Sequence, residues 1–498
     1  MNVNPITRLD YPDPDVIRVE DTYYMVSTTM HFMPGCEILQ SFDLVHWEHV
    51  TYVYETLDHT DAQQLKSGQN IYGQGMWAAS LRYHEGRFYI CFVANDTRKT
   101  YLYTSEKIDG PWKKQLIEGF YHDGSLLFDE DGRNYIVYGN DEIWITELNE
   151  DLTAPKKDGL HRLLVSDHKN PELGYEGSHI QKINGYYYIF LIHSLRDRWM
   201  RTEACFYSDS LEGEFTGGDV LCDDRGYCGQ GVAQGGIVDT PDGKWYAMLF
   251  QDSGAVGRIP ILVPVTWKDH FPFFGQNGHV PEEIEVHSTR PEYIYQPLVG
   301  SDDFCNGLLP RWQFNHDPDP RYYHLDALQG TYTITTREVC TELTQAVNTL
   351  TQRMSYPSCA AEVTVDASAL KEGDVAGLCA LQGCYAAVGI TKHHGKYEVL
   401  MLDKKEDGIL DMTEGTVVES HQMDFRLEAD FCNMKDEARC YYRVNKGDWL
   451  PIGTVHKLYF KLDHFTGCRF GLFCYAAEET GGSACFRDFK YYDVDEIS

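Results

Sequence analysis

Polar and apolar positions alternate along most of this chain in short runs, and helical periodicity is scarce. The runs are rich in aromatic and β-branched residues, which favour extended strands. They are separated by Asp-Gly, Asn-Gly and Glu-Gly pairs, which are typical of tight hairpin turns. We therefore predict an all-β protein built from short antiparallel strands.

One hairpin pattern recurs five times: an acidic or Asn residue, usually followed by Gly, and then a Tyr-rich strand. The five copies begin at Asp21, Glu85, Asp131, Asn184 and Asp242. They lie roughly 50 residues apart, about the length of one four-stranded sheet with its loops. This repeat predicts a five-bladed β-propeller over residues 1–297.

The pattern changes after Pro297. Residues 301–498 lack the hairpin pattern and contain alternating apolar runs such as 360–365 and 397–402. Such runs predict a β-sandwich of two antiparallel sheets. A propeller over 1–297 and a sandwich over 301–498 together account for a chain of 498 residues.

Charge narrows the range of partners. The chain has 43 Lys and Arg against 76 Asp and Glu, a formal net charge of −33. A surface this negative repels phosphate backbones and anionic lipids. No apolar run approaches the length of a membrane span. We therefore expect no nucleic-acid partner, no membrane partner and a substrate that is neutral or cationic.

The cysteines indicate a reducing compartment. There are 15, an odd number, without CxxC pairs, and several, such as Cys91 and Cys359, lie inside apolar strand-like runs. This pattern favours free thiols over a disulfide framework or a zinc site. The first residues also lack the charged and apolar regions of a secretory signal. We therefore expect a cytoplasmic protein.

The repeat also predicts where a site lies. The innermost strand of each propeller blade starts at one mouth of the central channel, so residues one strand length before each hairpin meet there. Counting back eight positions gives Asp13, Trp77, Asp123, Glu176 and Gln234. Three carboxylates, an indole and an amide should therefore converge on the propeller axis.

Three clustered carboxylates fit two chemistries. A hard divalent cation would take their oxygens as ligands. Cleavage of a glycosidic bond instead needs one protonated and one ionised carboxyl group on opposite sides of the sugar, and crowding can provide both forms. Trp77 favours the second chemistry, because a sugar ring stacks on an indole. Core packing is the alternative role for this side chain.

Several motifs carry a family resemblance. They are Tyr-Pro-Asp-Pro-Asp at 11–15, Gly-Met-Trp-Ala-Ala-Ser at 75–80, Asp-Gly-Ser-Leu-Leu-Phe at 123–128 and Glu-Gly-Ser-His-Ile-Gln at 176–181. In this order they resemble glycoside hydrolase family 43. Residues 348–353 and 374–382 resemble the C-terminal domain of the family's xylosidases. The resemblance implies a five-bladed propeller followed by a concanavalin-like jelly roll, and an inverting hydrolase.

The resemblance also implies roles for single residues. Asp13 matches the general base that activates a water, Glu176 matches the general acid, and Asp123 matches a third acid that orients and tunes the general acid. In inverting enzymes the base and the acid lie about 6.5–9.5 Å apart. Arg258 matches a substrate-binding Arg that follows a Gly near the end of the fifth blade.

Departures from the family pattern affect metal and sugar binding. Gln234 stands where many relatives carry a His that helps to hold a central calcium, so we expect no central metal and no required cofactor. Met30 lies near the position of an aromatic residue that touches the sugar. Asp302 and Asp303 are candidates for a structural Ca²⁺ on the sandwich.

Together these observations predict an exo-acting β-xylosidase that removes terminal xylose, with arabinofuranose as a second product, from xylo- and arabinoxylo-oligosaccharides. A sandwich packed beside the channel mouth would close one end of the pocket and favour exo over endo attack. One alternative is a protein that is primarily an α-L-arabinofuranosidase. Others are a non-catalytic carbohydrate-binding propeller and a calcium-dependent scaffold. The oligomeric state, including a homo-oligomer, stays open.

Overall fold

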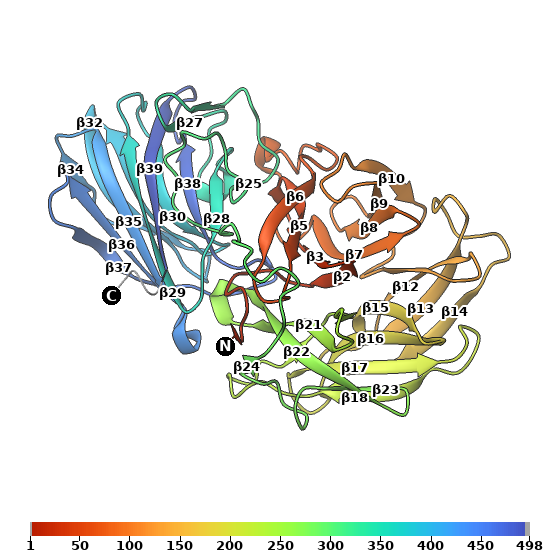
Figure 1. Ribbon diagram of the computed structural model, residues 1–498. Coiled ribbons are helices and arrows are strands. Elements are labelled where there is room, and N and C mark those ends of the chain that lie inside the picture. Colours follow the sequence, from red (N-terminus) through yellow and green to blue (C-terminus); the bar gives the residue numbers. More distant parts are fainter. Residues whose placement is uncertain (1, 494–498) are drawn as a thin grey trace.

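The computed structural model describes residues 2–493 and is almost entirely β, which confirms the predicted fold class. Figure 1 shows a propeller beside a sandwich. The only helical elements in the described residues are the 3₁₀ turns η1 (Lys66–Gly68), η2 (Gly254–Val256), η3 (Leu343–Gln345) and η4 (Cys432–Met434). Within the same residues, no helix has both the length and the apolar character needed to span a membrane.

Five sheets form the propeller, each with its innermost strand first in the chain. The first blade contains β2 (Asp15–Val19), β3 (Thr22–Ser27), β5 (Gly35–Ser41) and β6 (Glu48–Tyr54). The second blade contains β7 (Met76–His84), β8 (Arg87–Ala94), β9 (Lys99–Ser105) and β10 (Lys113–Ile117). The third blade contains β11 (Ser125–Phe128), β12 (Asn134–Asn140), β13 (Glu142–Leu148) and β14 (His161–Ser166). The fourth contains β15 (Glu176–Ile183), β16 (Tyr186–Ser194), β17 (Arg201–Ser208) and β18 (Thr216–Leu221); the fifth β19 (Val232–Ala233), β20 (Ile237–Asp239), β21 (Trp245–Asp252), β22 (Arg258–Lys268) and β23 (Phe271–Phe274). The short β1 (Asn2–Val3) pairs with β24 (Glu283–Ile284).

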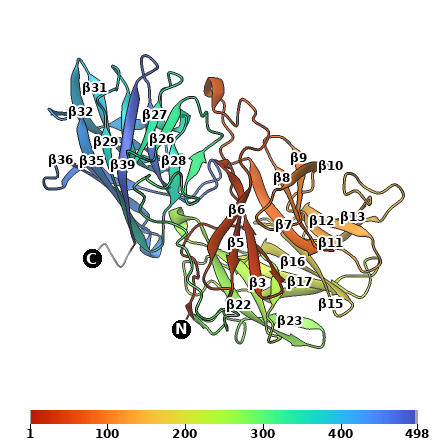
Figure 2. The ribbon, with the colours of Figure 1, turned by 45° about the horizontal axis from the view of Figure 1, so that its top comes forward.

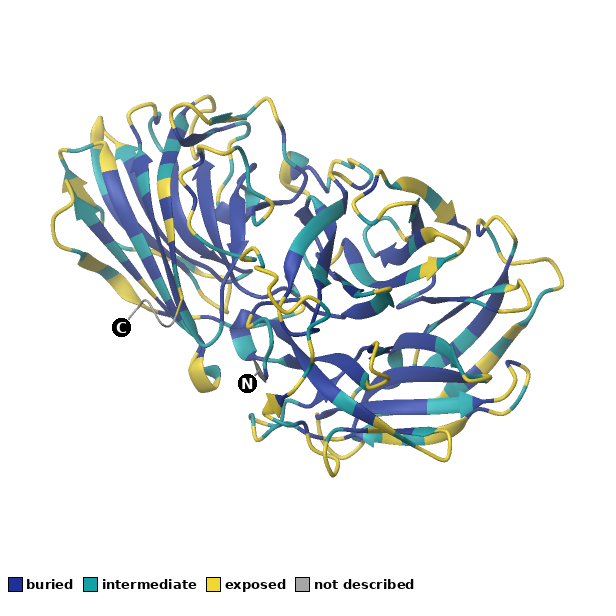
Figure 3. Ribbon diagram, in the orientation of Figure 1, coloured by how far each residue is buried: buried dark blue, intermediate teal, exposed yellow. Residues whose placement is uncertain are grey.

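Each predicted hairpin joins the innermost strand of a blade to the next strand. The turns need left-handed backbone: Asn184 and Gly185, for example, have φ of 50° and 83°. Asn and Gly adopt this conformation more readily than other residues, which explains the Asn-Gly and Asp-Gly pairs in the repeat. The strands that follow are apolar because neighbouring blades cover both their faces, as the buried central strands in Figure 3 show.

Two antiparallel sheets form the sandwich around one apolar core. One sheet contains β4 (Phe32–Met33), β25 (Gln313–Asn315), β28 (Leu350–Arg353), β30 (Val375–Leu381), β31 (Ala386–His393), β32 (Lys396–Lys404), β33 (Leu410–Met412), β34 (Thr416–Val418) and β38 (Arg469–Tyr475). The other contains β26 (Tyr323–Asp326), β27 (Thr331–Thr335), β29 (Ser358–Asp366), β35 (Gln422–Asp430), β36 (Glu437–Val444), β37 (Leu450–Lys457) and β39 (Ser483–Asp493).

The sandwich packs against the first blade (Figure 2). Strand β4 comes from the connection between β3 and β5, yet it pairs with β25 of the sandwich. Nearby, the buried Arg353 of the sandwich lies 2.8 Å from Glu37 and stacks over the ring of Tyr11. Backbone pairing and a buried ion pair therefore fix the sandwich beside one end of the propeller.

Candidate active site

The five residues predicted from the repeat lie where the innermost strands begin. Asp13 precedes β2, Trp77 is near the start of β7, Asp123 precedes β11, Glu176 opens β15, and Gln234 follows β19. Asp13, Asp123 and Gln234 have φ of 53°, 47° and 62°. Trp77 and Glu176 lie at β-bulges in their blades. A left-handed residue or a bulge at these positions redirects the side chain, and such backbone is concentrated at functional sites.

Asp13 is held by an arginine and a hydroxyl. Its Oδ1 accepts a hydrogen bond from Nη1 of Arg258 (2.9 Å), and its Oδ2 accepts one from Oγ1 of Thr28 (2.6 Å). Arg258 is 2% exposed, and its Nε and Nη2 atoms are buried without a hydrogen-bond partner among the described residues. These two donors therefore have a hydrogen-bonding capacity that the described residues leave unused.

Asp123 and Glu176 lie on the two sides of a histidine that the sequence analysis did not identify. Nε2 of His122 is 3.5 Å from Oδ2 of Asp123 and 3.5 Å from Oε2 of Glu176. Oδ2 of Asp123 also accepts a hydrogen bond from the Gly177 amide (3.1 Å), and Oε2 of Glu176 accepts one from Nδ2 of Asn140 (3.0 Å). Asn140, at the end of β12, was also missed.

The charged groups of this cluster shift one another's pKa values. Burial, together with the nearby Glu176 and Asp13, raises the pKa of Asp123 to about 6, although His122 opposes the shift. Burial alone would lower the pKa of His122, but Asp123, Glu176 and Asp13 outweigh it and raise that pKa to about 9. The site therefore contains a cationic imidazole and a carboxyl group that titrates near neutral pH.

An aromatic wall comes from both domains. Trp77 lies 5.8 Å from the ring of His122 and 5.4 Å from the ring of Phe465. Phe465 belongs to the sandwich connection between β37 and β38, and the guanidinium of Arg258 lies 4.4 Å from its ring centre. Its φ of 55° is unusual for an aromatic residue. The sequence analysis predicted a closing sandwich but did not identify this residue.

Asp10 joins the two domains beside this wall. Its Oδ1 accepts a hydrogen bond from the Arg258 amide (2.7 Å), and its Oδ2 accepts one from the Gly467 amide (2.8 Å). One carboxylate therefore fixes the segment that carries Arg258 relative to the one that carries Phe465.

Gln234 and Met30 line the site less directly. The Gln234 side chain packs on Gly177, where an added Cβ would lie 2.7 Å from Cγ of Gln234. Met30 is 2% exposed and exchanges two backbone hydrogen bonds of 3.1 Å with Met76, the neighbour of Trp77. The structure thus places Met30 beside the aromatic wall but buries its side chain.

Two groups of residues have atoms at a spacing that a metal could use. Nitrogen and oxygen atoms of His122, Asp123 and Glu176 lie within 4.8 Å of one another, but a protonated imidazole has no free lone pair with which to bind a metal. On the sandwich, the two oxygens of Asp302 accept hydrogen bonds from the Phe304 amide and from Nε1 of Trp312 (both 2.8 Å). Asp302 therefore already has a structural role, and the predicted Ca²⁺ stays a prediction.

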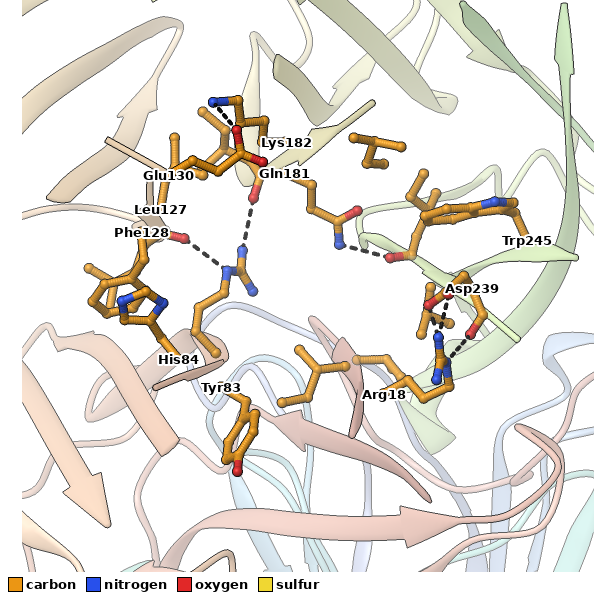
Figure 4. A pocket seen from close by; sticks show the side chains of 18 residues that line it. Arg18, Tyr83, His84, Leu127, Phe128, Glu130, Gln181, Lys182, Asp239 and Trp245 are labelled. Carbon is orange, nitrogen blue, oxygen red and sulfur yellow. Dashed lines mark hydrogen bonds and ion pairs between the residues drawn. The ribbon is translucent and has the colours of Figure 1, made fainter. Parts of the chain in front are cut away.

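Arg82 crosses the channel below the site. Arg82 donates to Oδ2 of Asp15 (2.8 Å), to Oγ of Ser125 (2.7 Å) and to the Leu126 carbonyl (2.8 Å), so it spans three blades. Beyond Arg82, a cavity of about 470 Å³ opens at the opposite mouth (Figure 4). Its cations are paired, as Arg18 is with Asp239.

Comparisons with known proteins match both parts of the chain. The model of glycosyl hydrolases family 43 matches residues 3–272, and the model of the β-xylosidase C-terminal concanavalin A-like domain matches residues 301–492. A β-xylosidase of Formosa agariphila is 26% identical over 99% of this chain and 89% of its own length.

Two solved structures are similar over nearly the whole chain. A bifunctional GH43-CE protein of Bacteroides eggerthii has a TM-score of 0.92 and 42% identity. The similarity covers 99% of this chain and 64% of that protein. A GH43 glycoside hydrolase, engineered to display both endo-xylanase and exo-arabinofuranosidase activity, has a TM-score of 0.88 and 27% identity, with 99% of both chains covered.

Proposed function

The chain belongs to glycosyl hydrolases family 43, and on that basis we propose that it is an inverting exo-acting β-xylosidase. Its substrates would be xylo- and arabinoxylo-oligosaccharides with a terminal xylose. The observation that carries the proposal is the arrangement of Asp13 and Glu176. Asp13 is bound by Arg258 and Thr28, whereas Glu176 lies in a separate cluster with Asp123 and His122.

Each cluster suits one half of the reaction. Both oxygens of Asp13 accept hydrogen bonds, as expected of a carboxylate that takes a proton from the attacking water. Glu176 is held by Asn140 and gives its proton to the glycosidic oxygen. The water oxygen forms the new bond to the anomeric carbon while the bond to the leaving group breaks, so the product sugar has the inverted configuration.

Two features support exo attack. The Asp15–Arg82 ion pair crosses the channel below the site, and Phe465 forms a wall at its sandwich side. A site bounded on two sides favours the end of a sugar chain over its middle.

The main alternative within the family is an α-L-arabinofuranosidase. It is favoured by the likeness to the engineered hydrolase with exo-arabinofuranosidase activity. Xylopyranosides and arabinofuranosides present similar hydroxyl groups, and the shape of the pocket discriminates between them. kcat/KM on p-nitrophenyl β-D-xylopyranoside and on p-nitrophenyl α-L-arabinofuranoside decides which substrate the enzyme prefers.

The role of Glu176 is tested with Glu176→Gln on two leaving groups. Xylobiose needs a proton donor, whereas p-nitrophenolate leaves with little help from an acid, so the variant should lose about 10²–10⁴-fold on xylobiose and much less on the aryl xyloside. Equal losses would contradict the role. A wild-type protein that binds xylobiose without hydrolysing any pentoside would instead be a carbohydrate-binding propeller.

The proposal also includes catalysis without a metal and a cytoplasmic location. The reaction uses water and two carboxyl groups, so EDTA should leave kcat/KM unchanged. All fifteen cysteines are free thiols, nine of them buried, which suits a reducing compartment and therefore a cytoplasmic location.

A further inference from the structure

His122 lies between two carboxyl groups without completing a hydrogen bond to either. Its Nε2 is 3.5 Å from both Asp123 and Glu176, and this atom is buried with no hydrogen-bond partner among the described residues. Such a position is costly for a neutral nitrogen but suits a cation that serves two anions.

The surroundings hold the ring in this position. The His122 carbonyl accepts a hydrogen bond from the Gly139 amide (3.0 Å), and the indole of Trp77 lies 5.8 Å from the imidazole. The charged groups that face the imidazole are Asp123 on its own segment, Glu176 on β15 and Asp13 beside β2. All three are acidic, and they keep the imidazole protonated at neutral pH.

A fixed cation here has two consequences for the proton donor. It lies between two carboxyl groups that repel each other whenever both are ionised, and so keeps Glu176 next to Asp123. It also lies beside the negative charge that forms on Glu176 as the proton leaves, which is where a preorganised charge lowers a barrier.

We propose that His122 is a positioning residue of the proton donor, an imidazole that bridges Asp123 and Glu176 and stabilises the carboxylate that Glu176 becomes. This inference rests on the proposed function, because it takes Glu176 to be the general acid. It adds a histidine to the three acids that the sequence indicated.

The kinetic test compares wild type with two variants. His122→Phe keeps a ring against Trp77 but removes both nitrogens, and His122→Gln keeps a hydrogen-bond donor without the charge. We expect His122→Phe to lose at least about tenfold in kcat/KM on xylobiose and less than about threefold on p-nitrophenyl β-D-xylopyranoside. His122→Gln should recover part of the loss. Equal losses on the two substrates would indicate a packing role and overturn the proposal.

The pH profile provides a readout that a packing role would not change. His122 opposes the raised pKa of Asp123, so removal of the imidazolium should let Asp123 keep its proton to higher pH. The limb of the pH profile of kcat/KM on xylobiose that lies near pH 6 should therefore move to higher pH in His122→Phe. A limb that stays in place would contradict the proposal.

An NMR titration tests the same inference without turnover. In protein labelled with ¹³C at Cε1 of histidine, the signal absent from His122→Phe identifies His122. Its pKa should lie near 9 in wild type and fall in Glu176→Gln. If the pKa of His122 is not raised, the proposal that His122 bridges the two acids is overturned, whether or not the protein hydrolyses pentosides. If the pKa is raised but the protein is inactive on pentosides, only the proposed function is overturned.

Discussion

Substitution of Phe465 tests whether the sandwich domain forms part of the active site. The ring of Phe465 lies 4.4 Å from the guanidinium of Arg258, which in turn binds Asp13, and 5.4 Å from Trp77. Phe465→Ala removes both contacts and a 5.6 Å contact with the ring of Phe460, but it leaves the backbone hydrogen bond from its amide to the Lys461 carbonyl (2.8 Å). The expected defect is therefore in catalysis and not in folding.

The size of the effect follows from the two contacts. A partly buried cation–π contact contributes about 1–2 kcal/mol, and an aromatic pair contributes about 0.5–1.5 kcal/mol. These contacts are present before the substrate binds, so only the part that holds Arg258 and Trp77 in place for the transition state affects kcat/KM, and we expect a loss of at most about 2 kcal/mol in transition-state binding. This corresponds to at most a roughly thirtyfold lower kcat/KM on xylobiose.

The assay measures kcat/KM on xylobiose and Tm for three variants. Phe465→Tyr keeps the ring and should retain most of the activity. Leu462→Ala is the matched control, since this side chain on the same connection is 74% exposed. The reasoning is refuted if Phe465→Ala keeps wild-type kcat/KM, or if its Tm falls so far that loss of folding explains the loss of activity.

Three further predictions follow from the same structure. Asp10→Asn should cost about 1–2 kcal/mol of local stability, because the Asn side chain has one accepting oxygen and cannot accept hydrogen bonds from the backbone amides of both Arg258 and Gly467. The same substitution should lower kcat/KM on xylobiose by up to about tenfold. His122 has a raised pKa, so its contribution to stability is full below pH 6.5 and is lost as the pH rises through 9. Tm of wild type minus Tm of His122→Phe should therefore decrease across that window, and a constant difference would contradict the shift. In the native protein a thiol reagent should modify the exposed thiols rapidly, and most of the other eleven only after denaturation; these exposed thiols are Cys222, Cys228, Cys305 and Cys432.

The repeat made much of the fold and site predictable. Every blade begins its innermost strand at the same mouth, so one count from the hairpins located Asp13, Asp123 and Glu176 together. Positions before each turn lie at the start of an innermost strand. The second strand of a blade returns to the same mouth, so a forward count from Asp131 would have led to Asn140 at the end of β12.

The remaining residues lack a periodic signal. His122 directly precedes Asp123, yet its significance depends on Glu176, which a different blade brings within 3.5 Å of Nε2. Phe465 is harder to predict, because it lies in a connection between two sandwich strands and reaches the site through contacts distant in sequence. The segment that carries it is held against the propeller by the hydrogen bond from the Gly467 amide to Asp10, a partner far away in the sequence.

The difference between the residues that the repeat predicts and those that it does not has a physical basis, and it bears on which sugar the enzyme prefers. Under the proposed mechanism, the acids that move protons must face one axis, and a repeated blade fixes that geometry for every member of the repeat. A wall that contacts the sugar needs only to approach from one side, so under the same proposal it can come from any element that packs against the mouth. Here Asp10 joins the two domains, because it accepts a hydrogen bond from one backbone amide of each. Changes in the segment around Phe465 can therefore alter the preference between xylose and arabinofuranose without displacing Asp13 or Glu176.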